Sequence, residues 1–468
     1  MTRPPVEPAG AGLIACVDFG STFTKAALVD VATGDLRATA SHRTTIETDV
    51  LDGWAACRAQ LLDVEPGAAD VEVRACSSAG GGLRIAVVGN EELVTAEAGR
   101  RVALSSGGRV VHVASGGLDE PAIAHLEASE PDLLLLVGGT DGGNAEVLLA
   151  CARALAGVPW PTPVVVAGNA EAHVEVVALL EDSGTPYVLA DNVVPRIGVL
   201  HPASARAAIR EMFLRHVIAG KHLSTGGDFS EMVRGATPDV VLTAVELLAR
   251  GLDEENPGVG DVVVVDIGGA TTDVHSVVES DSEEAGLSRQ VVATAPVTRT
   301  VEGDLGMRWS AVSTVVEGRA AGLLPHDACE RLLAAAEVRR ADPSHLPTGP
   351  DDVRMDEAIA STAAGLALRR HAGRAQVEFG PGGRVVERTG TDLREVDLLV
   401  GSGGVLRNSP ADMRQRVLGR VSTGHVEGGW QLPRNARVVV DQDYVLAPAG
   451  LLAHDHPAAA YRLLQRLR

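Results

Sequence analysis

One short pattern occurs at two places in the chain and constrains the fold more than any other feature. The stretches ACVDFGSTFTKAALVD (15–30) and VVVVDIGGATTDVHSVV (262–278) each read as a buried strand, a turn that begins Asp-x-Gly, and a second strand. Strands joined by so short a turn form a β-hairpin. The two aspartates are Asp18 and Asp266. The sequence therefore predicts two halves that open with the same structural element.

Between the hairpins the pattern changes to strand, glycine-rich loop and helix. DLLLLV (132–137) and PVVVAGN (163–169) are apolar strands, each followed by a helical segment. Apolar strands that alternate with helices predict a sheet covered on both faces. A periodic helix at 238–251 is followed by the acidic, turn-rich run 252–261, which indicates a domain boundary. We predict an N-terminal domain (13–255) with an α/β insertion (about 85–235), a C-terminal domain (258–445) and a C-terminal helix that packs back at the hinge (446–468).

Composition excludes several classes of partner. The net charge of −21 argues against nucleic acid, because duplex affinity depends on neutralising phosphates with cations. No apolar run approaches the length of a membrane helix, and the N-terminus MTRPPVEPAGAG does not resemble a signal peptide. The five cysteines are scattered, with no CxxC pair. We therefore expect a cytoplasmic protein without a membrane or nucleic-acid partner.

The hairpin turns carry groups suited to a phosphate and a metal ion. Glycine lets backbone N–H groups approach an anion, and hydroxyls can bond phosphate oxygens. An aspartate at a strand end can hold the water shell of Mg²⁺. Lys25, one of two lysines in the chain, can act as a point charge on a phosphate. The candidate phosphate-binding residues are Gly20, Ser21, Thr22 and Thr24 in the first hairpin, and Gly268, Gly269, Thr271 and Thr272 in the second.

A single turn of this kind is weak evidence, because short motifs recur by chance. The alternative is that each Asp-x-Gly is an ordinary hairpin turn and that Lys25 is a solvated strand residue. Finding both turns, each at the start of one half, favours the functional interpretation. A third glycine turn, at Gly401, Gly403 and Gly404, follows a strand and precedes a helix, which suits the adenosine end of a nucleotide.

The order of these elements resembles the actin/hexokinase/DnaK-type ATPase superfamily. That resemblance implies an α/β, two-domain actin-like (ribonuclease H-like) fold with an interdomain nucleotide cleft. The two hairpins match its two phosphate loops, and the third glycine turn matches its adenosine motif. Ala270 stands where chaperones of this class have a third glycine. The helix 238–251 and the segment LAPAGLLA (446–453) resemble its two hinge helices.

More specific strings resemble the glutamate mutase L (MutL or GlmL) family over about residues 13–460. They are GGTDGGN (138–144), DNVVP (191–195), DIGGATTDVHSV (266–277) and TVEGDLGMR (300–308). The resemblance implies an accessory ATPase that uses ATP binding and hydrolysis to drive interdomain motion. Its client would be an adenosylcobalamin-dependent mutase, from which it releases damaged cobalamin. The cofactors implied are ATP and Mg²⁺, and an oligomer or a small second subunit is also possible.

The resemblance assigns roles to single residues. Asp18, Asp266 and Lys25 are the candidate catalytic residues, and the two aspartates are the candidate metal ligands. Asp141 and Asn144, in a glycine-rich loop, are weaker candidates for contact with metal or phosphate, and a helix cap explains them equally well. Glu302 and Asp304 are candidates for closing the cleft or binding metal, although Asp304 can also simply start a helix.

Two other functions remain open at the level of sequence. One is a small-molecule kinase on the same fold, which requires a substrate base that we do not identify among these residues. The other is an actin-like scaffold whose assembly is regulated by ATP.

Overall fold

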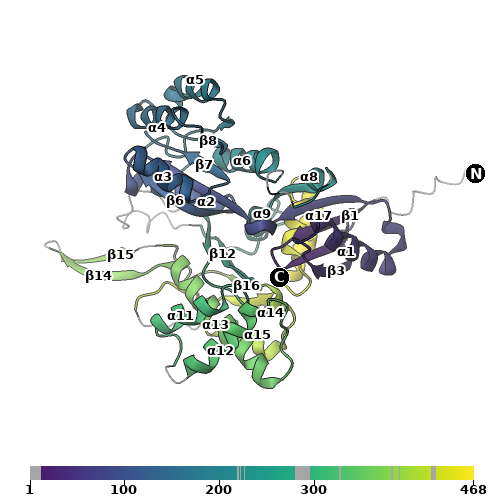
Figure 1. Cartoon of the computed structure of the whole chain (residues 1–468). Coiled ribbons are helices and arrows are strands. Elements are labelled where there is room, and N and C mark those ends of the chain that lie inside the picture. The colour runs from purple at the N-terminus through teal and green to yellow at the C-terminus, as the bar shows by residue number, and fades with distance from the viewer. Residues whose placement is uncertain are drawn as a thin grey trace, which may run out of the picture.

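In the described part of the chain, the strands form three five-stranded sheets and a separate two-stranded hairpin. The computed structural model describes residues 12–218, 221, 223–225, 227–279, 296–325, 328–380, 383–388, 390–422 and 428–468. The segment that we predict not to be a signal peptide therefore lies almost wholly outside the described residues. Three lobes are arranged around the central helix α9 (Figure 1). No helix in the described part is long and apolar enough to cross a membrane.

The first sheet contains the first predicted hairpin. Its order is β10–β4–β1–β2–β3, with β1, β2 and β3 antiparallel and β4 and β10 parallel to β1. In the β1–β2 register, Asp18 faces Lys25. The strands are β1 (Leu13–Phe19), β2 (Phe23–Asp30), β3 (Asp35–Arg43), β4 (Glu72–Ser77) and β10 (Val233–Ala236), and helix α1 (Val50–Val64) packs on them.

The second sheet repeats this plan. Its order is β13–β12–β11–β16–β17, with β11, β12 and β13 antiparallel and β16 and β17 parallel to β11. Here Asp266 faces Asp273. The two predicted hairpins are thereby confirmed, and both stand at the centre of equivalent sheets. The strands are β11 (Val262–Ile267), β12 (Thr272–Val277), β13 (Val297–Glu302), β16 (Leu398–Ser402) and β17 (Arg437–Val440).

The third sheet is inserted between β4 and β10 and is parallel throughout. Its order is β6–β5–β7–β8–β9. Its strands are β5 (Leu83–Gly89), β6 (Gly108–Ser115), β7 (Leu133–Leu136), β8 (Val164–Val166) and β9 (Tyr187–Leu189). The accompanying helices are α2 (Glu97–Ser105), α3 (Glu120–Ala128), α4 (Glu146–Ala156), α5 (His173–Ser183), α6 (Ala203–Met212) and the short α8 (Asp228–Met232). As the apolar strands predict, β5, β7 and β8 are buried on both faces.

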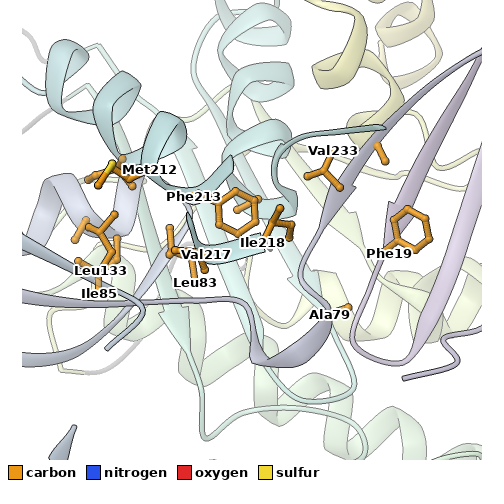
Figure 2. Close-up of a cluster of buried hydrophobic side chains, with 14 of the residues drawn as sticks. Phe19, Ala79, Leu83, Ile85, Leu133, Met212, Phe213, Val217, Ile218 and Val233 are labelled. Atoms are coloured by element: carbon orange, nitrogen blue, oxygen red, sulfur yellow. The ribbon is translucent and has the colours of Figure 1, made fainter. Parts of the chain in front are cut away.

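One hydrophobic core joins the inserted sheet to the first sheet. The cluster runs from Phe19 in β1, past Ala79 and Leu83, to Leu133 in β7. Figure 2 shows these side chains, with Phe213 of the connecting segment among them. Close-packed interiors resist deformation, so the two sheets form one mechanical unit.

Two helices connect the halves. α9 (Thr237–Arg250) has Pro238 in its first turn, buries its apolar face and ends at Gly251, which has φ +78°. The predicted helix at 238–251 is thus confirmed. α9 packs against α16 (Leu446–Leu452), and α17 (Pro457–Leu464) completes the cluster.

The remaining helices belong to the second half. They are α11 (Ala311–Ala320), α12 (Cys329–Ala341), α13 (Pro350–Ala372), α14 (Gly404–Arg407) and α15 (Ala411–Gly419). A hairpin of β14 (Ala375–Gly380) and β15 (Gly383–Arg388) extends from this lobe (Figure 1). All five cysteines are buried and unpaired.

Candidate functional site

The turns of the two hairpins are closed in the same way. Gly20 N–H donates to Phe23 O at 3.2 Å, and Gly268 N–H donates to Thr271 O at 2.9 Å. A Cβ atom placed on either glycine would lie 2.7 Å from that carbonyl oxygen. No side chain fits at such a distance, so glycine is required at both positions.

The two turns also meet each other. A Cβ atom placed on Gly269 would lie 2.8 Å from the Oγ1 atom of Thr22, so the second turn touches the first. The hydroxyls of Thr22 and Thr272 are buried and have no hydrogen-bond partner among the described residues. An unpaired buried hydroxyl costs free energy unless a ligand completes it. The structure thus leaves one unsatisfied hydroxyl in each hairpin.

The other predicted hydroxyl residues lie differently. Thr24 is fully buried, and its hydroxyl lies 3.3 Å from that of Thr44, within the first sheet. Thr271 contributes its carbonyl oxygen to the closure of the second turn. Ser21 is half-buried within the first turn.

The carboxylate of Asp18 is surrounded by protein donors. Thr237 Oγ1 donates to Asp18 Oδ1 at 2.6 Å, and the Tyr444 hydroxyl donates to Asp18 Oδ2. The Cys76 thiol lies 3.6 Å from Oδ1, and Lys25 Nζ lies 3.9 Å from Oδ2. Asp18 is only 4% exposed. Thr237 begins α9 and Tyr444 precedes α16, so both hinge helices hold this carboxylate.

Tyr444 is a site residue that sequence reasoning missed. It adopts φ +57°, an uncommon value for a residue other than glycine. Its ring lies 4.3 Å from Lys25 Nζ and 5.1 Å from the Arg407 guanidinium, within cation–π range. Burial and the nearby carboxylate of Asp18 raise the pKa of Tyr444 well above its usual value, so the phenol remains a donor. One side chain therefore links the first hairpin to the third glycine turn.

Asp266 has a more open environment. It is half-buried and faces Ser402 of the paired strand β16 in the sheet register. Burial raises the pKa of Asp266, while the charge of Lys25 lowers it and that of Asp18 raises it. The contact between Gly269 and Thr22 brings the turn after Asp266 to the hairpin that carries Asp18 and Lys25, although the two hairpins come from different halves of the chain.

The third glycine turn packs against the second hairpin. Gly403 has φ +104°, and a Cβ atom there would lie 2.2 Å from Ile267 O at the end of β11. Gly401 is packed against Leu418, whereas Gly404 faces open space. The predicted strand, turn and helix are confirmed, and Gly404 is the position at which a ligand has room to approach.

The segment 301–308 folds over the second turn. Met307 N–H donates to Gly268 O at 2.9 Å, and Arg308 N–H donates to Gly269 O at 2.8 Å. The Arg308 side chain lies beside Gly269 and 3.6 Å from Asp356. Sequence reasoning did not select Arg308, although it stands in the family string TVEGDLGMR.

Glu302 and Asp304 lie beside the second hairpin but are neutralised by the protein. Glu302 faces Thr272 in the sheet register. Arg370 of α13 contacts Glu302 Oε2 at 2.8 Å and Asp304 Oδ1 at 2.7 Å. Arg370 lowers the pKa of Asp304, whereas burial raises that of Glu302. This arrangement fixes the segment to α13.

Asp141 and Asn144 lie at the edge of the inserted sheet. Asp141 Oδ1 accepts hydrogen bonds from Ala170 N at 3.1 Å and from Asn192 Nδ2 at 2.9 Å. Asn144 Oδ1 accepts from Glu146 N at 2.7 Å in a local turn just before α4, whose N-cap is Ala145. In the described hydrogen bonds, neither side chain joins the hairpins.

The assembled groups fit a nucleotide with its magnesium ion. The hydroxyls of Thr22 and Thr272 lack partners, and the carboxylates of Asp18 and Asp266 are the hard oxygen donors that Mg²⁺ prefers. Lys25 is the cation beside these carboxylates. Among the described residues, no group of three or more His, Cys, Asp or Glu side chains could hold a metal ion.

The strand order and the paired hairpins define a two-domain α/β protein of the actin-like ATPase fold. A family model described as MutL protein matches residues 14–467. Protein MutL of Clostridium tetanomorphum is 35% identical over 457 residues, which cover 96% of this chain and 98% of that protein. The chain belongs to the MutL protein family, and the resemblance drawn from its sequence is confirmed.

Similarity to solved structures is remote. An acetone carboxylase chain in its nucleotide-free structure is 15% identical with a TM-score of 0.33, and the match covers 77% of this chain and 62% of that chain. The ethanolamine utilization protein EutJ from Carboxydothermus hydrogenoformans is 11% identical with a TM-score of 0.29, covering 99% and 91%. The fold assignment rests on the strand order of this chain.

Proposed function

We propose that the two hairpins bind ATP with Mg²⁺ and promote its hydrolysis. The observation that supports this most is the contact between the turns, where Thr22 and Thr272 each hold an unpartnered hydroxyl. The flanking hydroxyls and the N–H groups of both turns would hold the phosphates, Lys25 would add a positive charge, and Gly404 would leave room for the adenosine.

We assign different duties to the two aspartates. Asp18 and Asp266 would hold the magnesium ion through its water shell, and the bound ion would neutralise developing charge on the phosphates. Asp266, which is half-buried opposite Ser402, would orient the attacking water and accept its proton. Asp18 would remain fixed by Thr237 and Tyr444 and transmit its position to the hinge helices.

We further propose that the ATPase serves an adenosylcobalamin-dependent mutase of the glutamate mutase type. Membership of the MutL protein family supports this client, and a cytoplasmic location suits five unpaired cysteines. A change in angle between the halves would favour an open mutase from which damaged cobalamin is released. This requires the ATP and ADP states to differ in affinity for the mutase.

A reactivation assay tests the proposal. Glutamate mutase blocked with hydroxocobalamin is mixed with the protein, Mg-ATP and fresh adenosylcobalamin. We expect mutase activity to recover with ATP and not with ADP, and the Asp266→Ala variant to give no recovery. If ATP is hydrolysed but the mutase stays blocked, the client assignment is wrong. If no adenine nucleotide binds in calorimetry, the nucleotide site itself is wrong.

A further inference from the structure

A cavity in the second half, outside the hairpin site, has the features of a ligand pocket. It has a volume of about 330 Å³ and lies between α12, α13 and the chain that follows α15. Small-molecule sites commonly have volumes of about 300–1,000 Å³. Its apolar wall is formed by Leu324, Leu332, Met355, Val421 and Leu432.

Three arginines also line this cavity, namely Arg331, Arg369 and Arg420. Among the described residues, none of them forms an ion pair with a carboxylate. Arg331 and Arg420 are exposed, as solvated arginines often are, but Arg369 is half-buried. The Arg369 guanidinium lies 5.7 Å from the centroid of the Trp430 ring. The Arg374 guanidinium lies 4.0 Å from the centroid of the same ring. Burial and the like charge of Arg374 lower the pKa of Arg369, so an anion at this point would relieve an unfavourable charge.

A buried hydroxyl provides an independent sign of a ligand. Ser361 lines the cavity from α13 and is 8% exposed, and its Oγ atom has no hydrogen-bond partner in the described part of the chain. The neighbouring Thr362, also on the wall, bonds Ala358 O at 2.7 Å and is satisfied. Buried hydroxyls are normally paired, so Ser361 Oγ, which is shielded at the cavity wall, is a group that an occupant would satisfy.

We propose that this cavity binds a small organic anion that has an apolar body and a single carboxylate or phosphate group. The apolar body would lie among the leucines, Met355 and Val421, and the anionic group would lie against Arg369, with Ser361 donating to it. Charge-assisted hydrogen bonds to arginine are stronger than neutral ones, which selects an anion over a neutral or cationic analogue. The site does not depend on ATP binding by the hairpins.

Calorimetry with the full chain tests the site, using compounds of one chain length. Octanoate and octyl phosphate are the anionic probes, octylammonium reverses the charge, and acetate lacks the apolar body. We expect saturable binding of one anionic probe per chain, at least about tenfold weaker binding of acetate, and no binding of octylammonium. The preference between octanoate and octyl phosphate identifies the head group.

Variants locate the binding. Ala358→Leu places additional carbon in the cavity and should abolish binding, and Arg369→Gln should weaken it at least about tenfold. Arg340→Gln, in an exposed α12 ion pair with Glu337, is the matched control and should leave binding unchanged. Thermal unfolding verifies that each variant is folded. If Ala358→Leu does not fold, the result with Arg369→Gln decides whether the cavity is the binding site. Absence of saturable binding of both anions, or affinity unchanged in folded Arg369→Gln, overturns the proposal.

Discussion

The two hairpins have the same turn but place their aspartates in different surroundings. Asp18 faces a cation, Lys25, and accepts hydrogen bonds from both hinge helices. Asp266 faces another acid, Asp273, whose charge is balanced by Arg299 at 3.2 Å. Equivalent positions in the two similar sheets therefore have different surroundings. The first carboxylate is anchored to the hinge, and the second is left open to a ligand.

Replacing Asp266 with alanine should have the largest effect on activity and little effect on stability. The side chain is half-buried and faces Ser402 in the sheet, so its truncation removes few protein contacts. We expect ATP turnover to fall by at least about 10²-fold, the lower end of what a positioned acid–base group contributes. Steady-state phosphate release measures this, with the melting temperature as the control. A near-normal rate would remove Asp266 from the site.

Asp18→Asn should abolish turnover and also destabilise the fold, which Asp266→Ala should not do. The amide has a single acceptor oxygen, so either Thr237 or Tyr444 loses its acceptor. An unsatisfied buried donor costs about 1–3 kcal/mol. Urea unfolding of the two aspartate variants measures the difference. Equal stability of Asp18→Asn and Asp266→Ala would contradict the inference that Asp18, and not Asp266, is anchored to the hinge.

Removal of the unpartnered hydroxyl should have the same effect on ATP affinity in each of the two hairpins. Thr22→Val and Thr272→Val remove a hydroxyl that makes no hydrogen bond within the described protein while keeping the shape of the side chain. We expect ATP affinity to fall by about tenfold in each, the equivalent of about one hydrogen bond, with stability unchanged or increased. Thr44→Val, which removes a hydroxyl that already donates to Gly20 O, is the contrasting variant and should lower stability. Calorimetric titration with ATP measures the loss of affinity, and unfolding measures the loss of stability.

The smallest effect concerns pH. If ionised Asp266 is required, activity falls as the pH drops through its pKa, which burial has raised and Lys25 partly lowers. Removal of the lysine charge in Lys25→Met should therefore move the acidic limb of the rate profile to higher pH. Arg37→Met, on the exposed strand β3, serves as the charge-matched control and should not move it. An unshifted limb in Lys25→Met would mean that the two groups do not interact.

The local sequence pattern was sufficient to predict the strands, turns and helices. It was not sufficient to predict which residues from distant parts of the chain contact one another. The Asp-x-Gly turns, α9 and the strand before Gly401 follow from glycine placement and apolar periodicity, which act over a few residues. Tyr444 lies 426 positions from Asp18, and Thr237 lies 219 positions from it. Contacts across such separations arise from the packing of whole sheets, and a positive φ at a tyrosine has no sequence signature. The different surroundings of the two aspartates were therefore visible only in the structure.

The common hydrophobic core of the first sheet and the inserted sheet makes the inserted lobe a rigid lever arm. Any rotation of the first half about the hinge is carried undiminished into this lobe. Displacement grows with distance from an axis, so such a rotation would move the outer helices α4 and α5, which lie away from α9, more than the turns around Asp18 (Figure 1). Under the proposed mechanism, a small rearrangement at the hinge would produce a large displacement of these outer helices.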